Sequence, residues 1–204
     1  MKDYKIEEFI DVLNSDAPTP GGGGASALAG ALSAALCGMV ANLTTGKKKY
    51  AEYQGEIDEI IIAAKALSIR MENLIEEDAR AFGPLAKAYG IPKDEPGRDE
   101  VLENALCAAA EPPYRIVETA GEVRDIIVRL KDIGSRLAIS DVGVAAALCS
   151  AAARGAAMNV YINTKLMTDR DKAERMNEVT GALVSEISKD CDAVYDSIKG
   201  DLKA

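Results

Sequence analysis

The chain has 204 residues, with 24 basic and 33 acidic side chains and a formal net charge of −9. It contains no histidine, which excludes imidazole metal sites and Ser-His-Asp or Cys-His nucleophiles. Any proton transfer must therefore use carboxylates, lysine, tyrosine, cysteine or water. The acidic balance, with a pI near 4.7, argues against a nucleic-acid partner, since such partners are bound by neutralising their phosphates.

The apolar composition favours a helical fold, and the cysteine spacing favours a reducing compartment. Aromatic residues are only 4% of the chain while hydrophobic residues are 48%, so alanine and branched aliphatic side chains fill the core, which favours closely packed helices. The cysteines share no CxxC spacing and are expected to be free thiols in a reducing cytoplasm: Cys37, Cys107, Cys149 and Cys191. Residues 25–43 are uncharged and nearly long enough to span a membrane, but alanine, glycine and serine dominate them. We predict a buried helix there and no membrane partner.

The first half of the chain predicts three helices. Apolar residues three and four apart over 6–13 indicate an amphipathic helix that ends at Asn14. Two prolines and four glycines over 17–24 predict a loop. A small-residue helix from about 25 to 43 follows, and then a long helix from 52 to about 89. Gly83-Pro84 is expected to kink or interrupt the long helix.

The second half predicts three or four more helices. A short helix over 98–110 precedes Pro112-Pro113, which predicts a new helix start, because proline suits the first turn. Ser140 is expected to cap an alanine-rich helix that ends near Thr168, and Thr168 or Asp169 is expected to cap the last helix. No segment alternates like a strand. We predict an all-α protein with one domain over residues 1–204, a bundle of about six or seven helices, several of them long.

The proline and glycine run is the first candidate site. Unpaired N–H groups before a helix carry a partial positive charge and bind anions, so Gly21, Gly22, Gly23, Gly24 and Ser26 could receive a carboxylate or a phosphate. The run lacks the Gly-Lys-Ser/Thr of a Walker loop, which argues against a nucleotide. A flexible linker, or close helix packing, explains the same composition.

The second candidate lies on the alanine-rich helix. Ser140 and Asp141 open it, and Asn159 and Asn163 lie one turn apart further along. The two amides could bind a flat heterocycle, with Asp141 supplying a charge. Alternatively, Asp141 only complements the helix dipole and the asparagines only satisfy buried backbone groups.

Two charged segments complete the set of candidates. Asp78, in the run EDARAF, lies one turn before Phe82 where the apolar stripe of the long helix passes, so its carboxylate is expected to be partly buried with a raised pKa. Lys47, Lys48 and Lys49 form a basic run in an acidic protein and could bind a polyanionic tail. A solvated helix face and a solvated turn are the simpler alternatives.

Four segments together are similar to one known family: PTPGGGGASALAGALSAALCGMVANLTTGKKKY, EDARAF, AAEPPYRIVE and SDVGVAAALCSAAARGAAMNVYIN. Their order over most of the chain resembles the formiminotransferase-cyclodeaminase C-terminal family, whose stand-alone members include formiminotetrahydrofolate cyclodeaminases and methenyltetrahydrofolate cyclohydrolases. The resemblance implies an all-α homodimer that acts on tetrahydrofolate one-carbon derivatives without a metal or redox cofactor. It also implies a folate loop at residues 21–24 with Ser26, a carboxylate at Asp78, and site residues Ser140, Asp141, Asn159 and Asn163.

That chemistry is compatible with a chain that lacks histidine. The bridging carbon of 5,10-methenyltetrahydrofolate is already an activated cation, so water needs only a modest base, and Asp141 or Asp78 could act as that base. Lys47, Lys48, Lys49 and the glycine loop would bind the glutamate tail. Nothing in the motifs separates hydrolysis from deamination. A helical protein that binds folate, or assembles, without turnover is the alternative.

Overall fold

A computed structural model describes residues 4–204, in which helices are the only regular elements. The six α-helices are α1 (Ile6–Leu13), α2 (Gly22–Thr44), α3 (Gln54–Tyr89), α4 (Arg98–Ile133), α5 (Ile139–Thr164) and α6 (Arg170–Lys203). Two 3-10 turns, η1 (Lys48–Tyr53) and η2 (Arg136–Ala138), precede α3 and α5. The prediction of an all-α bundle with several long helices is confirmed, and residues 1–3 of the predicted domain lie outside the described residues.

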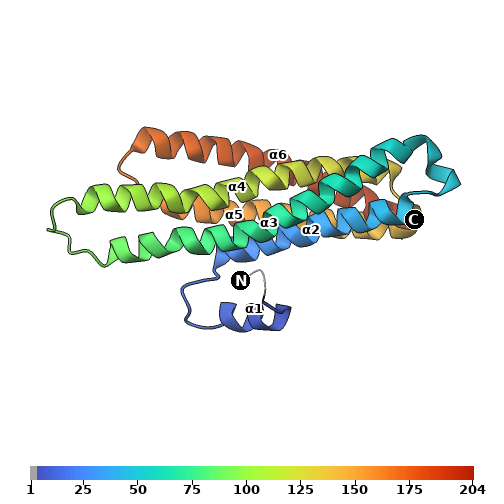
Figure 1. Ribbon diagram of the computed structural model, residues 1–204. Coiled ribbons are helices and arrows are strands. Elements are labelled where there is room, and N and C mark those ends of the chain that lie inside the picture. Colours follow the sequence, from blue (N-terminus) through green and yellow to red (C-terminus); the bar gives the residue numbers. More distant parts are fainter. Residues whose placement is uncertain (1–3) are drawn as a thin grey trace.

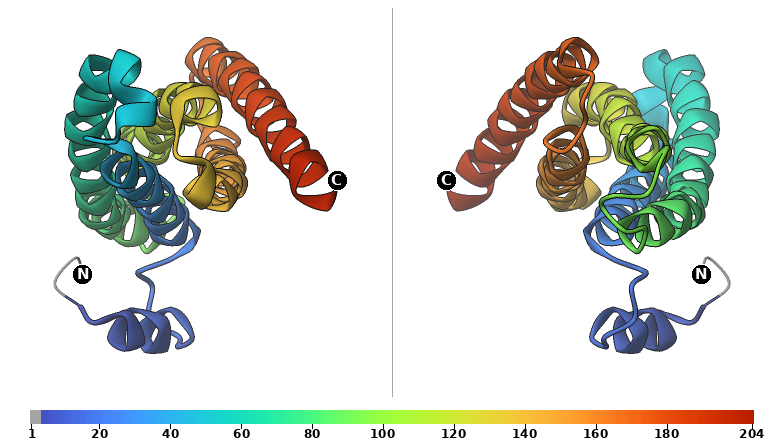
Figure 2. Two further views of the ribbon diagram at one scale, coloured as in Figure 1. Left: turned by 90° about the vertical axis from the view of Figure 1, so that its right-hand side faces the viewer. Right: turned by 90° about the vertical axis from the view of Figure 1, so that its left-hand side faces the viewer.

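The long helices form one elongated bundle (Figures 1 and 2). Helix α2 packs against α3 and α5, α4 packs against α3 and α5, and α6 covers α5 and part of α4. The short helix α1 lies apart from the bundle, on the side where α2 begins (Figure 2). Of its residues only Phe9 is buried, so α1 adds little to the core.

Small residues bring the central helices close together. An added Cβ at Gly30 of α2 would lie 2.7 Å from Cε of Met71 on α3, so glycine makes this approach possible. On the other side of α2, the hydroxyl of Ser33 donates a 2.7 Å hydrogen bond to the carbonyl of Ala145 on α5. By length and composition alone, α2 and the segment Arg136–Thr164 could each cross a membrane, but 56% of each apolar window is buried inside the bundle.

The buried residues form two separate hydrophobic clusters. The large cluster fills the bundle between α2, α3, α4, α5 and α6. A smaller one joins the end of α3 and the start of α4 to the start of α6, and includes Leu85, Leu106 and Met167. Along α3, Asp78 lies between Ile75 of the large cluster and Leu85 of the small one.

The expected break at Pro112-Pro113 is wrong, because α4 continues through both prolines. Proline lacks the N–H that would bond to the carbonyl four residues earlier. For Pro113 that carbonyl belongs to buried Ala109, and it instead accepts a 3.2 Å hydrogen bond from Nδ2 of Asn163 on α5. For Pro112 it belongs to Ala108, which is exposed to water. Helix α3 likewise runs uninterrupted through Pro84.

Two helix starts differ from the predictions, and a third agrees with its prediction. Helix α2 begins at Gly22, so three of the four glycines form its first turn. Ser140 is not a cap, because the 3-10 turn η2 leads directly into α5 and Ser140 lies inside the first turn of α5. The cap at Asp169 is confirmed, since its carboxylate accepts a 3.0 Å hydrogen bond from the N–H of Lys172.

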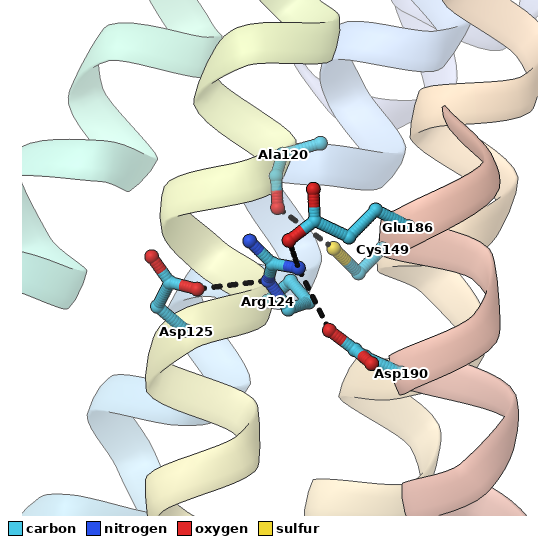
Figure 3. A network of polar contacts seen from close by, with 6 residues as sticks. All are labelled: Ala120, Arg124, Asp125, Cys149, Glu186 and Asp190. Atoms are coloured by element: carbon cyan, nitrogen blue, oxygen red, sulfur yellow. Dashed lines mark hydrogen bonds and ion pairs between the residues drawn. The ribbon is translucent and has the colours of Figure 1, made fainter. Parts of the chain in front are cut away.

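An arginine joins α4 to α6 on the outside of the bundle (Figure 3). Arg124 pairs with Glu186 at 2.9 Å and with Asp190 at 2.7 Å, both on α6, and with neighbouring Asp125 at 2.8 Å. These carboxylates raise the pKa of the Arg124 guanidinium, although its partial burial opposes the shift. Because only 13% of the Arg124 side chain is exposed, the group also packs as part of the α4–α6 contact.

Candidate active site

A cleft of about 150 Å³ opens where α2, α3, α4 and α5 meet. Its lining comes from the loop before α2, the first turn of α2, the last third of α3, one residue of α4 and the end of α5: Pro18, Thr19, Gly21, Gly22, Gly23, Asp78, Phe82, Ala109, Asn159, Ile162 and Asn163. The structure thus brings together three of the sequence-predicted groups, namely the glycine run, Asp78 and the two asparagines. Asp78 is the only ionisable side chain in this lining.

The carboxylate of Asp78 faces the N-terminus of α2. It accepts a hydrogen bond from the backbone N–H of Gly24, which lowers its pKa, but burial has the larger effect and raises the pKa above the ordinary aspartate value. The partial positive charge at the helix terminus favours the ionised form in the same way as the hydrogen bond. The sequence prediction of a partly buried carboxylate with a raised pKa is confirmed.

The charged residues beside Asp78 form ion pairs and do not line the cleft. Glu76 pairs with Arg80 on the same helix at 3.5 Å, as expected for a spacing of four residues. Glu77 pairs with Arg115 of α4. Asp78 therefore contributes its charge to a cleft that is otherwise lined by neutral groups.

The two asparagines connect the cleft to the helices around it. Nδ2 of Asn159 donates to the carbonyl of Gly155 at 3.0 Å, one turn earlier on α5. Nδ2 of Asn163 donates to the Asn159 carbonyl at 2.8 Å as well as to Ala109. Both amides therefore satisfy backbone carbonyls, as the alternative interpretation states. Both side chains also line the cleft, so that interpretation does not exclude a binding role.

Several lining residues were not predicted from the sequence as site residues. Pro18 and Thr19 belong to the proline and glycine run, but the prediction names only Gly21–Gly24 and Ser26 as its site residues. Phe82 enters the prediction only as a neighbour of Asp78, and Ala109 and Ile162 are not predicted as site residues. Phe82 did carry a signal, because a residue four positions after Asp78 lies on the same helix face. The sequence gives no such signal for Ala109 and Ile162, because their position in the cleft depends on how α4 packs against α5.

The remaining predicted residues lie elsewhere in the chain. Ser26 does not line the cleft; its hydroxyl donates to the Gly22 carbonyl at 2.7 Å and lies against Gly155 of α5, so it serves helix packing. Lys47, Lys48 and Lys49 are exposed beyond the far end of α2. The 23 residues of α2 rise by roughly 33 Å, so within one chain these lysines do not reach the glycine run.

Ser140 and Asp141 are also remote from the cleft. Asp141 lies 18 residues before Asn159 on the continuous helix α5, which corresponds to roughly 27 Å. Ser140 instead lines an apolar groove between α5 and the end of α6. Within a single chain, Asp78 and Asp141 therefore do not act on the same atom.

Together, the fold and the cleft define a class of protein: an all-α bundle with one carboxylate fixed at a helix N-terminus and two amides beside it. The formiminotransferase-cyclodeaminase family profile matches residues 5–181. The chain belongs to this family.

Similar proteins cover nearly the whole chain. The methenyltetrahydrofolate cyclohydrolase of Methylorubrum extorquens is 39% identical over 199 residues, which are 95% of this chain and 95% of that protein. The formimidoyltransferase-cyclodeaminase of Mus musculus is 29% identical over 98% of this chain, which spans only 38% of the mouse protein. The crystal structure of formiminotetrahydrofolate cyclodeaminase from Thermotoga maritima superimposes with a TM-score of 0.85 at 30% identity, covering 97% of this chain and 98% of that one.

Proposed function

We propose that this protein is a folate one-carbon enzyme that hydrolyses 5,10-methenyltetrahydrofolate to 10-formyltetrahydrofolate, cyclises 5-formiminotetrahydrofolate with release of ammonia, or does both. The observation that carries the proposal is the single carboxylate, Asp78, in a cleft otherwise lined by neutral groups. A negative charge held there stabilises the cationic methenyl carbon and attracts the substrate that carries it. The similar proteins named above support this choice of substrate.

In the hydrolytic direction, Asp78 acts as the general base. Water adds to the methenyl carbon while the carboxylate of Asp78 takes one of its protons. The bond from that carbon to N5 of the folate then breaks, and N5 takes the proton that Asp78 holds. The hydroxyl group on the carbon loses its proton to solvent and becomes the carbonyl of the formyl group, which stays on N10, so one proton is released overall. Asn159 and Asn163 offer polar groups at the cleft wall to the flat ring.

The deaminase direction uses the same groups. N10 attacks the formimino carbon, Asp78 accepts the proton that N10 loses, and the leaving nitrogen is protonated and departs as ammonia. Neither direction requires a metal or redox cofactor, because the carbon centre is already electrophilic. We also expect the protein to work in the cytoplasm, where its four free cysteines would stay reduced.

The test follows the methenyl absorbance in two assays of the purified protein. With methenyltetrahydrofolate, loss of colour faster than in buffer identifies hydrolysis, and with 5-formiminotetrahydrofolate, gain of colour identifies cyclisation. Asp78→Asn is expected to lower kcat by about 100-fold or more in whichever reaction occurs, as for loss of a general base. Glu72→Gln is the matched control, because Glu72 is exposed on the same helix outside the cleft. Folate binding without turnover in either assay would contradict the enzyme and favour the non-catalytic alternative.

We further propose a homodimer in which the far ends of the partner's helices complete the cleft. A cleft of about 150 Å³ is smaller than the roughly 300–1,000 Å³ of ordinary ligand pockets, so a folate needs more surface than one chain supplies. Helix α2 has no charged residue, and α2 and α5 expose large apolar side chains: Leu32, Met39, Leu43, Val144, Met158 and Ile162. Large exposed apolar side chains gathered on two helices that pack together are typical of an interface.

The direction of pairing follows from where that surface ends. On α5 it runs from Val144, next to Asp141, to Ile162, which lines the cleft. A two-fold axis perpendicular to the helices brings the Asp141 end of one chain to the Asp78 end of the other. In this arrangement Ser140, Asp141 and Lys47–Lys49 of one copy serve the cleft of the second copy, with the lysines near the glutamate tail.

A further inference from the structure

The glycine run before and inside α2 contains four residues with different surroundings. An added Cβ at Gly21 meets nothing within 4 Å. At Gly22 it would lie 3.1 Å from Nδ2 of Asn159, and at Gly24 it would lie 3.2 Å from Cβ of Pro20. These two contacts are tight, and small shifts of the neighbours would relieve them.

Gly23 differs from the other three. A Cβ added there would lie within 2.6 Å of Cγ and both carboxylate oxygens of Asp78. No side chain can be accommodated at that separation unless the carboxylate moves. The carboxylate of Asp78 therefore occupies the volume in which any other residue at position 23 would have its first side-chain atom.

Backbone conformation does not explain the glycine at this position. Among the described residues only Gly46 and Gly97 have positive φ, and Gly23 lies within the regular α-helix α2. Alanine is the better residue in a helix. The requirement for glycine at position 23 is thus one of space, and Asp78 is the group that takes the space.

We propose that Gly23 is a positioning residue that seats the Asp78 carboxylate against the first turn of α2, a role that rests on the proposed catalytic function of Asp78. With no Cβ at position 23, the carboxylate lies directly against the first turn of α2, close enough for the N–H of Gly24 to lower its pKa. A side chain at position 23 pushes the carboxylate off that N–H and away from its place at the cleft. Gly23 thereby acts through Asp78 and not by binding substrate itself.

The experiment places Gly23→Ala in two backgrounds, the natural chain and Asp78→Ala. The control is Gly55→Ala, because Gly55 lies in the first turn of α3 outside the cleft and an added Cβ there meets nothing within 4 Å. In the natural chain, Gly23→Ala is expected to lower Tm and to reduce kcat at least tenfold with a smaller change in KM. In the Asp78→Ala background the obstructing carboxylate is gone, so Gly23→Ala is expected to raise Tm, because alanine favours the helix. Gly55→Ala is expected to leave kcat unchanged and to leave Tm unchanged or slightly raised in the natural chain.

The reversal in the sign of the Tm change separates positioning from simple loss of packing. If Gly23→Ala fails to fold alone but folds when combined with Asp78→Ala, the proposal is supported. If it lowers Tm equally in both backgrounds, or leaves Tm and kcat unchanged in the natural chain as Gly55→Ala is expected to do, the proposal is overturned. Full activity of Asp78→Ala would instead contradict the catalytic role of Asp78. The reversal of the Tm change would still show whether Gly23 makes room for the Asp78 carboxylate.

Discussion

The Asp78 side chain is partly buried and must also be ionised for the proposed reaction. Its carboxylate must be ionised to serve as a base, yet burial raises its pKa and so disfavours the ionised form. The hydrogen bond from the Gly24 N–H recovers part of that cost. Activity that needs the ionised form is lost when the pH is lowered. We expect this loss to begin at a higher pH than it would for an exposed aspartate.

The same shift predicts how stability depends on pH. Because the folded state holds the Asp78 proton more tightly than the unfolded state, the free energy of unfolding decreases as pH rises through the interval between the ordinary and the raised pKa. Asp78→Asn removes this titration. We expect the variant to have a higher Tm than the natural protein above that interval and to lose this advantage below it. Thermal melts at a series of pH values check the prediction, and a Tm difference that stays constant with pH would contradict it.

At the scale of helices, the sequence predicted element type better than element boundaries. The spacing of apolar residues located α1 and α6 correctly, since a helical stripe is a local property. The continuity of α4 through Pro113 was not predictable, because the carbonyl that the proline leaves free is satisfied by a residue 54 positions away in sequence. The start of α2 inside the glycine run likewise depends on packing against α3 and α5.

The junction between α4 and α5 predicts a measurable loss of stability. Asn163→Ala leaves the buried Ala109 carbonyl without its donor, and an unsatisfied buried carbonyl costs about 1–3 kcal/mol. We expect urea denaturation to show a loss of that size, and a smaller one for Asn159→Ala, whose amide donates within its own helix. In a Pro113→Ala background the restored N–H can serve the carbonyl, so Asn163→Ala should cost less there. If Asn163→Ala lowers the free energy of unfolding equally in both backgrounds, the unsatisfied Ala109 carbonyl is not the cause of the lost stability.

At the scale of the whole molecule, the site residues taken from motifs divide into two groups that lie far apart along the bundle. The sequence does not indicate this, because a motif records residue types and not the distance that a long helix places between them. Asp78, Asn159 and the glycine run meet because α2, α3 and α5 cross at one level. Asp141 and Lys47–Lys49 do not join them within one chain, which is why the proposed cleft needs a second copy.

A mixing experiment tests this shared cleft directly. Asp78→Asn and Asp141→Asn are each expected to lower activity by about 100-fold, because every cleft of either homodimer lacks one carboxylate. A hybrid dimer of the two variants has one cleft with both substitutions and one with neither. Co-expression with random pairing should therefore restore about a quarter of the natural activity, since half of the dimers are hybrids and each has one intact cleft.

The outcome separates the possible arrangements of the site. Light scattering at micromolar protein should give the mass of two chains for the natural protein, both variants and the hybrid, and a monomeric mass would contradict the dimer. If the mixture is no more active than its components, the two carboxylates do not meet across an interface. If Asp141→Asn alone is fully active, Asp141 is not part of the site, and the far end of α5 contributes to assembly but not to the chemistry.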